Sequence, residues 1–589
     1  MKTVLRSLHR GEWGLIAVNA VLIYCAVWLD LRIPEYMTEL TVIIQTPGGT
    51  VSQVLREGGW MLLCALGSLA CSIVVGFTAA RVAAAVSRRL RHGVYAKVMD
   101  FSLKEIGDFS TPSLINRTTN DITQVQLLVV IAMMVIIRAP MMAILALAKI
   151  SRTHWEWTAL TAATVLVMLV IIGTMMSYAL PRFRRTQALT DDVNRVARES
   201  LTGLQVVRAY RAEDFQEAKF DVANKRLTRN TLQANMALTV MNPTMFLVMN
   251  GLTLGIYWIG ALLISDIAIT GPADFNDRLT VFSNMVVFMA YAMQVVMAFM
   301  LLLMVFMMAP RALVSANRIG EVLNTRATIV DGTRTAGNPD RAGTVEFRNV
   351  GFRFPGAAED VLHDISFIAH PGETVAIIGA TGSGKTTVLN LVPRFYDVTS
   401  GQVLVNGVDV REYTQEALRE TIGYVPQKAV LFAGTITDNV GYGKPNASRA
   451  DLERAVAIAQ ARDLVDRDDI GYDGEVAQGG TTFSGGQRQR LSIARAVASD
   501  PQIYLFDDSF SALDFRTERG LRDALERETG DVTTLVVAQR IGTIRHADRI
   551  VVLDFGRTVG VGTHDELMET CAVYREIAES QLSAEELDR

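Results

Sequence analysis

The sequence predicts an α-helical transmembrane domain with six spans, followed by an α/β domain of the phosphate-loop type. Three observations carry this prediction. Six apolar runs lie before residue 310, strand-like and helical stretches alternate after residue 343, and one strand-like run leads into a GxxxxGKT loop. The chain has 589 residues, room for about three to four domains of ordinary size, so a single core is excluded.

Composition excludes several classes of protein. Half of the residues are hydrophobic and only 20% are charged, which argues against disorder and against an ordinary soluble enzyme. The net charge of −4 gives no sign of a protein that neutralises nucleic-acid phosphates, so no nucleic-acid partner is expected. The four cysteines show no CxxC spacing, which excludes a disulfide framework or a thiolate metal site.

The apolar half contains six runs whose lengths are close to the roughly 20 residues that a helix needs to cross a ~30 Å hydrocarbon core. They cover residues 15–33, 59–80, 127–150, 155–180, 236–265 and 281–309. The first run follows Lys2, Arg6 and Arg10, as in a signal peptide, but no A-x-A-like cleavage site follows it. We therefore expect a retained helix and a multi-pass protein in contact with the lipid bilayer.

Basic residues concentrate in two long loops, between the second and third runs and between the fourth and fifth. By the positive-inside rule, the N-terminus, both loops and everything after the sixth run should be cytoplasmic. The plasma membrane of a bacterium is the expected location. Residues 81–126 and 182–235 have helical periodicity, which predicts that the membrane helices extend into the cytoplasm. Residues 113–120 and 201–210 are the expected turns toward a partner domain; the alternative is a solvated, charged helical hairpin.

A polar stretch at residues 325–342 predicts a linker. The expected organisation is a transmembrane domain at 1–324, this linker, a nucleotide-binding domain at 343–578 and a tail at 579–589. Strand-like runs at 344–347, 374–378, 503–506 and 534–537 alternate with helical stretches, which indicates an α/β domain.

The phosphate loop follows the second of these runs directly. Its glycines allow backbone N–H groups to surround phosphates, and the following helix N-terminus favours negative charge. Lysine would reach the terminal phosphates and threonine would ligate Mg²⁺. The predicted ATP-binding residues of this loop are Gly379, Ala380, Thr381, Gly382, Ser383, Gly384, Lys385 and Thr386. Asp507 ends a later hydrophobic strand, where a carboxylate can lie beside the phosphate-bound Mg²⁺.

A further motif narrows the family. The run Phe483, Ser484, Gly485, Gly486, Gln487 resembles the signature of ATP-binding cassette (ABC) proteins, and residues 343–578 match the family's order of motifs. The whole chain resembles an ABC exporter half-transporter, a six-helix transmembrane domain fused to an α/β P-loop ABC nucleotide-binding domain. The resemblance implies ATP and Mg²⁺ as cofactors. It also implies a second half-transporter, because in this family each ATP touches the phosphate loop of one cassette and the signature of the other.

The same resemblance assigns further residues. Phe354 stands where an aromatic ring stacks on adenine, and Gln427 stands where a glutamine senses Mg²⁺ and communicates with the membrane helices. Thr386, Gln427 and Asp507 are therefore the implied Mg²⁺ ligands. Ser511, Ala512, Leu513 and Asp514 match the loop that links the two nucleotide sites.

Two catalytic positions depart from the family pattern. Asp508 stands where the family has a glutamate that polarises the attacking water, and the shorter side chain shifts the carboxylate by roughly 1 Å, which can lower the rate ~10²-fold. Gln539 stands where the family has a histidine that reaches the γ-phosphate, and an amide carries no positive charge. His546 is a nearby substitute, although its register does not match. Neutral drift in a working homodimer is the alternative interpretation.

The expected function is an ATP-driven heterodimeric exporter of hydrophobic or amphipathic compounds. This chain would bind ATP at a degenerate site and supply its signature to a partner with a complete catalytic set. The alternatives are a lipid flippase, a peptide exporter, a siderophore importer with the exporter fold, and an ATP-gated channel or regulator. Arg138 lies mid-span, where ionised groups normally face a cavity or a partner. We expect it to line the transport pathway, for an anionic or amphipathic cargo; the alternative is a structural contact with another helix or a displaced span boundary.

Overall fold

The computed structural model describes residues 8–45, 49–151, 155–267, 272–466 and 471–581 of the chain. Its contacts divide it into two compact units. The helical unit is Met1–Val98 with Pro112–Thr325, and the nucleotide unit is Met99–Thr111 with Arg326–Arg589. Lys2, Arg6 and most of the predicted C-terminal tail, from residue 582 onward, lie outside the described residues.

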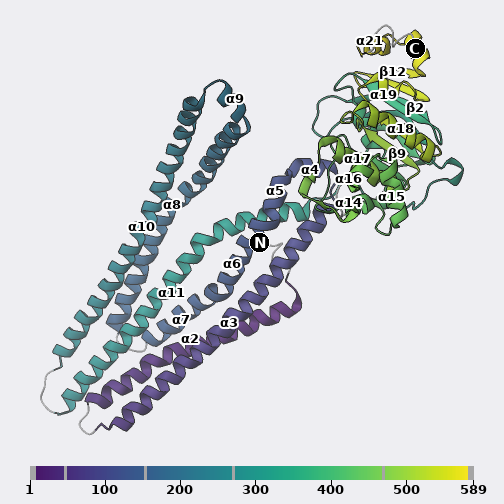
Figure 1. Cartoon of the computed structure of the whole chain (residues 1–589). Helices are drawn as coiled ribbons and strands as arrows, with labels where there is room; N and C mark the ends of the chain where they lie inside the picture. Colours follow the sequence, from purple (N-terminus) through teal and green to yellow (C-terminus); the bar gives the residue numbers. More distant parts are fainter. Residues whose placement is uncertain (1–7, 46–48, 152–154, 268–271, 467–470, 582–589) are drawn as a thin grey trace. The chain divides into compact units, whose positions relative to one another are not determined.

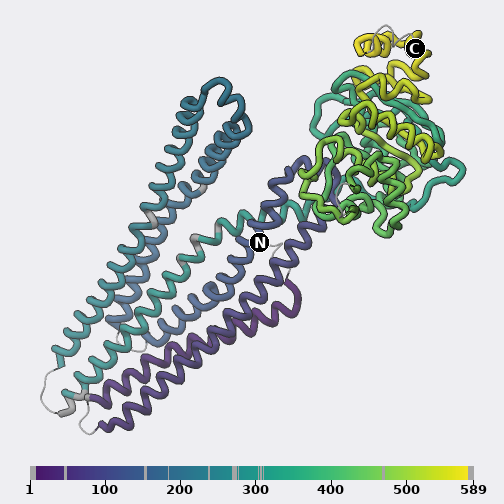
Figure 2. Tube along the Cα trace, in the orientation of Figure 1, coloured from purple at the N-terminus to yellow at the C-terminus, as the bar shows by residue number. Residues whose placement is uncertain are grey.

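The helical unit contains long helices and a few short helical segments (Figure 1). They are α2 (Arg10–Gln45), α3 (Val51–Met99), α5 (Thr111–Asn116), the π-helix η1 (Arg117–Asp121), α6 (Ile122–Ile131), the π-helix η2 (Ala132–Ile136), α7 (Arg138–Ile150), α8 (Trp155–Thr202), α9 (Leu204–Ala209), α10 (Glu213–Ser265) and α11 (Pro272–Asn324). Helices α8 and α10 pack along each other and are joined by the short α9, as Figures 1 and 2 show.

Six stretches of the described residues are long and apolar enough to cross a membrane. They are Arg10–Ile44, Val51–Met99, Thr111–Ile150, Trp155–Thr202, Glu213–Ser265 and Asp277–Leu302, and each overlaps one of the six predicted runs. Large apolar side chains such as Trp60, Leu66 and Phe77 are exposed along α3. Such an apolar exterior suits a hydrocarbon surrounding. The helical backbone suits it too, because a helix satisfies its own backbone hydrogen bonds.

The structure corrects the position of the first predicted turn. Residues 113–120 continue the helices α5 and η1, and the chain turns earlier, around α4 (Leu103–Phe109). Pro112 occupies the second position of α5, where a missing N–H leaves no helical bond unmade. At the second predicted position, 201–210, the chain does pass from α8 to α10 through α9. That this turn meets a partner domain stays a prediction.

Helix α4 belongs to the nucleotide unit. One buried carboxylate attaches it there. Glu105 is 3% exposed and accepts hydrogen bonds from the backbone N–H and hydroxyl of both Ser102 and Thr328, at 2.6 to 3.3 Å. Burial opposes its ionisation, but these hydrogen bonds outweigh burial and lower the pKa of Glu105 below its ordinary value. The first loop is thereby joined to the start of the predicted linker.

The rest of that linker is also attached to the nucleotide unit. Gly332 N–H donates to the carbonyl of Tyr413, Arg334 N–H to that of Glu412, and Asn338 N–H to that of Asn406, at 2.8 to 3.0 Å.

The nucleotide unit contains all the strands of the described chain. They are β1 (Val345–Phe352), β2 (Leu362–Ala369), β3 (Thr374–Gly379), β4 (Ser400–Val405), β5 (Val408–Asp409), β6 (Ile422–Val425), β7 (Gly434–Thr435), β8 (Glu475–Val476), β9 (Ile503–Asp507), β10 (Thr533–Val537), β11 (Arg549–Asp554) and β12 (Arg557–Gly562). The four predicted strand-like runs are confirmed as parts of β1, β3, β9 and β10.

These strands form two main sheets. An antiparallel sheet has the order β2-β1-β4-β5, and a second sheet has the order β12-β11-β3-β10-β9-β6. In the second sheet β11, β3, β10, β9 and β6 are parallel, and β12 is an antiparallel edge. This is the predicted α/β fold.

Helices cover the strands of this unit. They are α12 (Lys385–Leu391), α13 (Gln415–Glu420), α14 (Ile436–Val440), α15 (Arg449–Ile458), α16 (Arg462–Val465), α17 (Gly485–Ala498), α18 (Phe515–Thr529), α19 (Ile541–Ile544), α20 (His564–Thr570) and α21 (Ala572–Gln581), with the 3₁₀ turns η3 (Pro339–Arg341), η4 (Gly441–Gly443), η5 (Gly471–Asp473) and η6 (Gln478–Gly480).

Candidate functional site: the carboxyl edge of the parallel sheet

Strand order brings the predicted catalytic residues together. Strand β10 lies between β3 and β9, and its last residue, Val537, pairs with both Ile377 and Asp507. Parallel strands end at one edge, so the phosphate loop after β3, the acids after β9 and Gln539 after β10 meet there. Ligands of open α/β sheets bind at this edge.

Two glycines of the phosphate loop are required by space. A Cβ at Gly379 would lie 2.1 Å from the carbonyl oxygen of Leu553, and one at Gly384 would lie 2.5 Å from Cδ2 of Leu362. Gly384 also has φ +96° and caps the N-terminus of α12. The loop therefore presents backbone instead of side chains at the start of this helix.

Two polar side chains of the loop are buried. Lys385 Nζ donates to the carbonyls of Gly379 and Ala380 at 2.8 Å each, and burial lowers the pKa of its ammonium against the opposing charges of Asp508 and Asp507. The hydroxyl of Ser383 is buried and has no hydrogen-bond partner in the described part of the chain. A buried hydroxyl is normally hydrogen-bonded, and a phosphate oxygen is a suitable acceptor for this one.

The predicted Mg²⁺ ligands Thr386 and Asp507 are in contact. Thr386 Oγ1 donates to Asp507 Oδ1 at 2.8 Å. Burial, with help from the charge of Asp508, raises the pKa of Asp507 despite the Thr386 bond and the charge of Lys385. A buried carboxylate beside a second acid is a suitable ligand for a divalent cation, because oxygen ligands of this kind are those Mg²⁺ prefers.

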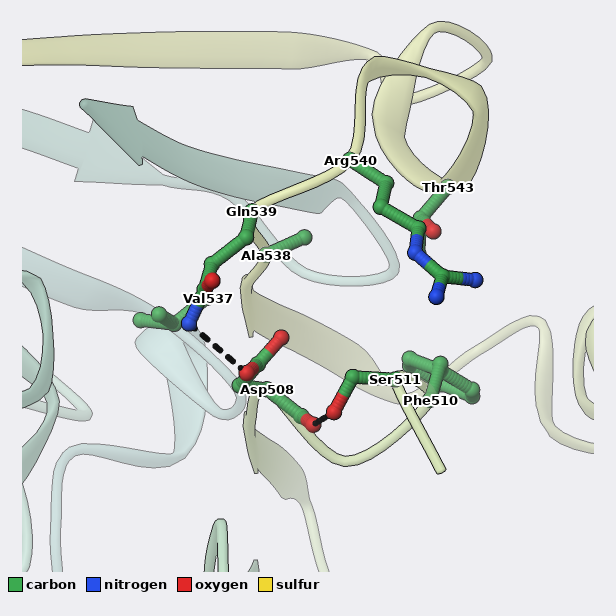
Figure 3. A pocket seen from close by; sticks show the side chains of 8 residues that line it. All are labelled: Asp508, Phe510, Ser511, Val537, Ala538, Gln539, Arg540 and Thr543. Atoms are coloured by element: carbon green, nitrogen blue, oxygen red, sulfur yellow. Dashed lines mark hydrogen bonds between the residues drawn. The ribbon is translucent and has the colours of Figure 1, made fainter. Parts of the chain in front are cut away.

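Asp508 has an unusual backbone, and one of its two carboxylate oxygens is hydrogen-bonded (Figure 3). Its φ of 46° lies in the left-handed region, which aspartate tolerates better than most residues, and its N–H donates to the carbonyl of Val537 at 2.9 Å. One carboxylate oxygen accepts from Gln539 Nε2 at 2.9 Å and from Gln427 Nε2 at 3.3 Å. The Ser511 hydroxyl donates to its carbonyl at 2.8 Å.

Asp508 and Gln539 line one small cavity, together with Phe510, Ser511, Val537, Ala538, Arg540 and Thr543. His546 is outside this lining, and its Nε2 accepts from Arg545 at 3.1 Å. His546 therefore does not replace the missing histidine. Arg540, whose side chain Figure 3 shows across the cavity from Asp508, was not singled out from the sequence, although a cation directly after Gln539 was a signal for it.

The signature residues form the start of α17. Ser484 is the N-cap, and it exchanges hydrogen bonds with Gln487, from Ser484 N to Gln487 Oε1 at 2.9 Å and from Gln487 N to Ser484 Oγ at 3.4 Å. Phe483 packs against the hydrophobic core and anchors the turn. This reciprocal capping fixes the helix start while leaving the N-terminus exposed.

The signature, the predicted intersite loop and the catalytic edge are packed together within this unit. A Cβ at Gly486 would lie 2.9 Å from the carbonyl of Ala512, and Leu513 packs beside it. Asp514 caps α18 and accepts from the Thr517 N–H and hydroxyl at 3.0 and 2.7 Å. Ser511 completes the connection through its bond to Asp508.

Two predicted residues lie apart from this edge. Phe354, just after β1, is 37% exposed, and its ring meets those of Phe352 and Tyr396 edge-on. Arg138 is in the helical unit, where it donates to Asp30 Oδ2 at 2.9 Å and reaches Ser72 Oγ at 3.5 Å. The structure thus shows the contact with other helices, the alternative for Arg138; its role in a transport pathway stays a prediction.

Comparison with known proteins identifies the family. Residues 20–299 match the model of the ABC transporter transmembrane region, and residues 362–511 match the ABC transporter model. An uncharacterized ABC transporter ATP-binding protein of Mycobacterium tuberculosis is 38% identical over 589 residues, which cover 98% of each chain. The chain belongs to the ABC transporter family. It is a half-transporter, with one transmembrane region and one cassette, and a multi-pass membrane protein, as the sequence predicts.

Other relatives of this half-transporter carry more specific names. The ATP-dependent lipid A-core flippase of Chromohalobacter salexigens is 31% identical over 99% of this chain and 98% of its own. A Bacillus subtilis protein named as a multidrug export ATP-binding/permease protein is 32% identical over 83% of this chain and 82% of its own. A solved bacterial Atm1-family ABC exporter with ATP bound superposes with a TM-score of 0.81 at 26% identity, covering 98% of this chain and all of its own. The half-transporter therefore has the exporter fold.

Proposed function

We propose that this half-transporter is one subunit of a heterodimeric exporter that moves hydrophobic or amphipathic compounds outward across a bacterial plasma membrane, driven by ATP. The observation that carries the proposal is the state of Asp508. Its carboxylate is bound by the amide of Gln539, where the family pattern has a glutamate and a histidine. An amide-bound, shortened carboxylate is poorly placed to polarise an attacking water.

The residues of the phosphate loop support ATP binding. The buried Ser383 hydroxyl, the Lys385 ammonium and the N-terminus of α12 would hold the phosphates, while Phe354 would stack on the base. Thr386, Asp507 and Gln427 would hold Mg²⁺, which, when bound, supplies positive charge to the β- and γ-phosphates. The chain therefore keeps the groups that bind nucleotide and departs only at the two that act on the reacting phosphate.

The signature of this chain would act on a partner. Ser484, Gly485, Gly486 and Gln487 lie at an exposed, capped helix start, which suits contact with a phosphate held by another cassette. In this account the two cassettes close on ATP, and their closure switches the spans from inward to outward opening. Hydrolysis at the partner's complete site resets the cycle. The N-terminus and the cassette would then be cytoplasmic.

Uphill transport in vesicles tests this proposal. Inside-out vesicles containing the complex should accumulate an amphipathic dye with ATP and not with a non-hydrolysable analogue. Dye movement that only equilibrates, or that proceeds equally with the analogue, would identify a gate and contradict the pump. The similarity to a lipid A-core flippase favours a lipid as the second candidate cargo, so the same vesicles should also be assayed with a fluorescent lipid.

A further inference from the structure

The helical unit contains a cavity of about 320 Å³ between α2, α7 and α11. This volume is in the range of about 300 to 1,000 Å³ that is typical of small-molecule sites. Most of its wall is apolar, and two polar residues, Asp30 and Gln294, complete it. The apolar lining residues are Ile33, Pro34, Met37, Met142 and Ala290.

Asp30 offers a fixed carboxylate to this cavity. Its Oδ2 accepts from Arg138 at 2.9 Å, and Arg138 is itself held by Ser72. Oδ1 of Asp30 has no hydrogen bond within the described residues. Arg138 is not part of the cavity lining, so its charge orients Asp30 without facing a bound molecule.

Gln294 offers a second acceptor. Its Nε2 donates to the backbone carbonyl of Asp30 at 3.5 Å, which orients the amide. Its Oε1 is buried and has no hydrogen-bond partner among the described residues. A buried, unpartnered carbonyl is destabilising unless a donor satisfies it, so a turn of this amide toward a donor in the cavity would be favourable.

The nearby cations are already paired. One turn along α2, Glu35 accepts from Arg32 at 2.8 Å and also forms an ion pair with Lys149. Neither Arg32 nor Lys149 lines the cavity. The polar part of the lining is therefore one carboxylate and one neutral amide, and no cation lines it to hold an anion.

We propose that this cavity is a binding site for an apolar compound that carries a protonated amine. The ammonium donates to Asp30 Oδ1, and the Gln294 amide turns so that its Oε1 accepts as well. The apolar body lies against Ile33, Pro34 and the two methionines, whose flexible side chains can adapt to it. The inference rests on the proposed function and names its cargo class. The sequence pointed to Arg138 as the residue that selects the cargo, with an anionic or amphipathic compound expected. The proposed site uses the carboxylate of its partner Asp30 instead.

Binding of a fluorescent amine to the full chain, purified with any partner in nanodiscs without nucleotide, tests the site. Dansylcadaverine has a primary amine on an apolar fluorophore, and its N-acetyl derivative has the same body without the charge. The amine should bind about tenfold or more tightly than the acetyl derivative, because charge-assisted hydrogen bonds supply the difference. Asp30→Asn should remove most of this preference.

A gain of affinity separates binding from folding. Gln294→Glu adds a second carboxylate to the lining and should tighten binding of the amine about tenfold, a result that misfolding cannot produce. Glu39→Gln, an exposed position on the same helix, is the matched control and should bind like the wild type. Equal binding of both probes to the wild type, no binding of either, or no gain in Gln294→Glu would overturn the inference.

The result of the binding experiment does not depend on whether the complex transports its cargo. Dye accumulation in vesicles with no amine preference in nanodiscs would reject the cavity and leave the exporter. The amine preference without ATP-driven accumulation would establish the site and reject the proposed function.

Discussion

Gln539 Nε2 donates to Asp508 Oδ2 at 2.9 Å, and Asp508 is only 8% exposed. The two departures from the family pattern therefore contact each other directly. Gln427 donates to the same oxygen, so two amides hold one carboxylate. The two donors occupy the lone pairs with which this oxygen would accept a proton from an attacking water.

Restoring both family residues should change turnover of the complex only modestly. In Asp508→Glu with Gln539→His, a second competent site at most about doubles the rate, because the partner's site already carries most of the hydrolysis. The measurement is steady-state ATPase activity of the purified complex. A rise of about 10²-fold would show that this site limits the cycle and that the assumed asymmetry is wrong.

Disrupting the signature of this chain should lower ATP turnover of the complex strongly. Ser484→Arg places a bulky cation where the partner's phosphate should lie, and turnover should nearly vanish. Ser448→Arg is the matched control, since Ser448 also caps a helix in a capping box with Asp451 but lies outside the signature. Full activity of the Ser484→Arg complex would remove the idea that this chain completes the partner's site.

The unpartnered Ser383 hydroxyl predicts two changes of opposite sign. Ser383→Ala should raise the free energy of unfolding of the nucleotide-free chain by about 1 kcal/mol, because it removes a buried unsatisfied group. The same change should weaken ATP binding severalfold. Thermal unfolding and equilibrium ATP binding measure the two effects. Destabilisation without nucleotide would mean that the hydroxyl already has a partner.

Glu105 predicts a pH dependence of stability. Its pKa is lowered in the folded state, so its contribution is complete above the unfolded pKa, near 4.5, and is lost as pH falls through the folded value. Glu105→Gln should lower the free energy of unfolding by about 2 kcal/mol at neutral pH and by much less in acid. Thermal unfolding over this pH range checks it. Asp108→Asn, exposed on the same helix, should behave like the wild type throughout.

The sequence predicts much of the nucleotide unit because its determinants are local. The glycines from Gly379 to Gly384 and the strand ending in Asp507 each follow from a short run of residues. The six spans follow equally from apolar runs of sufficient length. These features depend on backbone geometry and hydrophobicity, which neighbouring residues fix.

The contacts between distant residues could not be predicted in this way. Asp30 and Arg138 are 108 positions apart, and only the packing of α2 against α7 brings them together. The sequence singled out the arginine and missed its partner, although an aspartate in an apolar run was a signal. The bond between Gln539 and Asp508 likewise depends on the order of β9 and β10 in the sheet, which no local pattern reveals.

The most direct test of the central claim is to purify this chain in mild detergent from its native membrane and identify its companions by mass spectrometry. The account predicts a stoichiometric second half-transporter with glutamate and histidine at the positions of Asp508 and Gln539. Recovery of this chain alone, as a homodimer with substantial ATPase activity, would contradict it, because Asp508 and Gln539 would then suffice for catalysis.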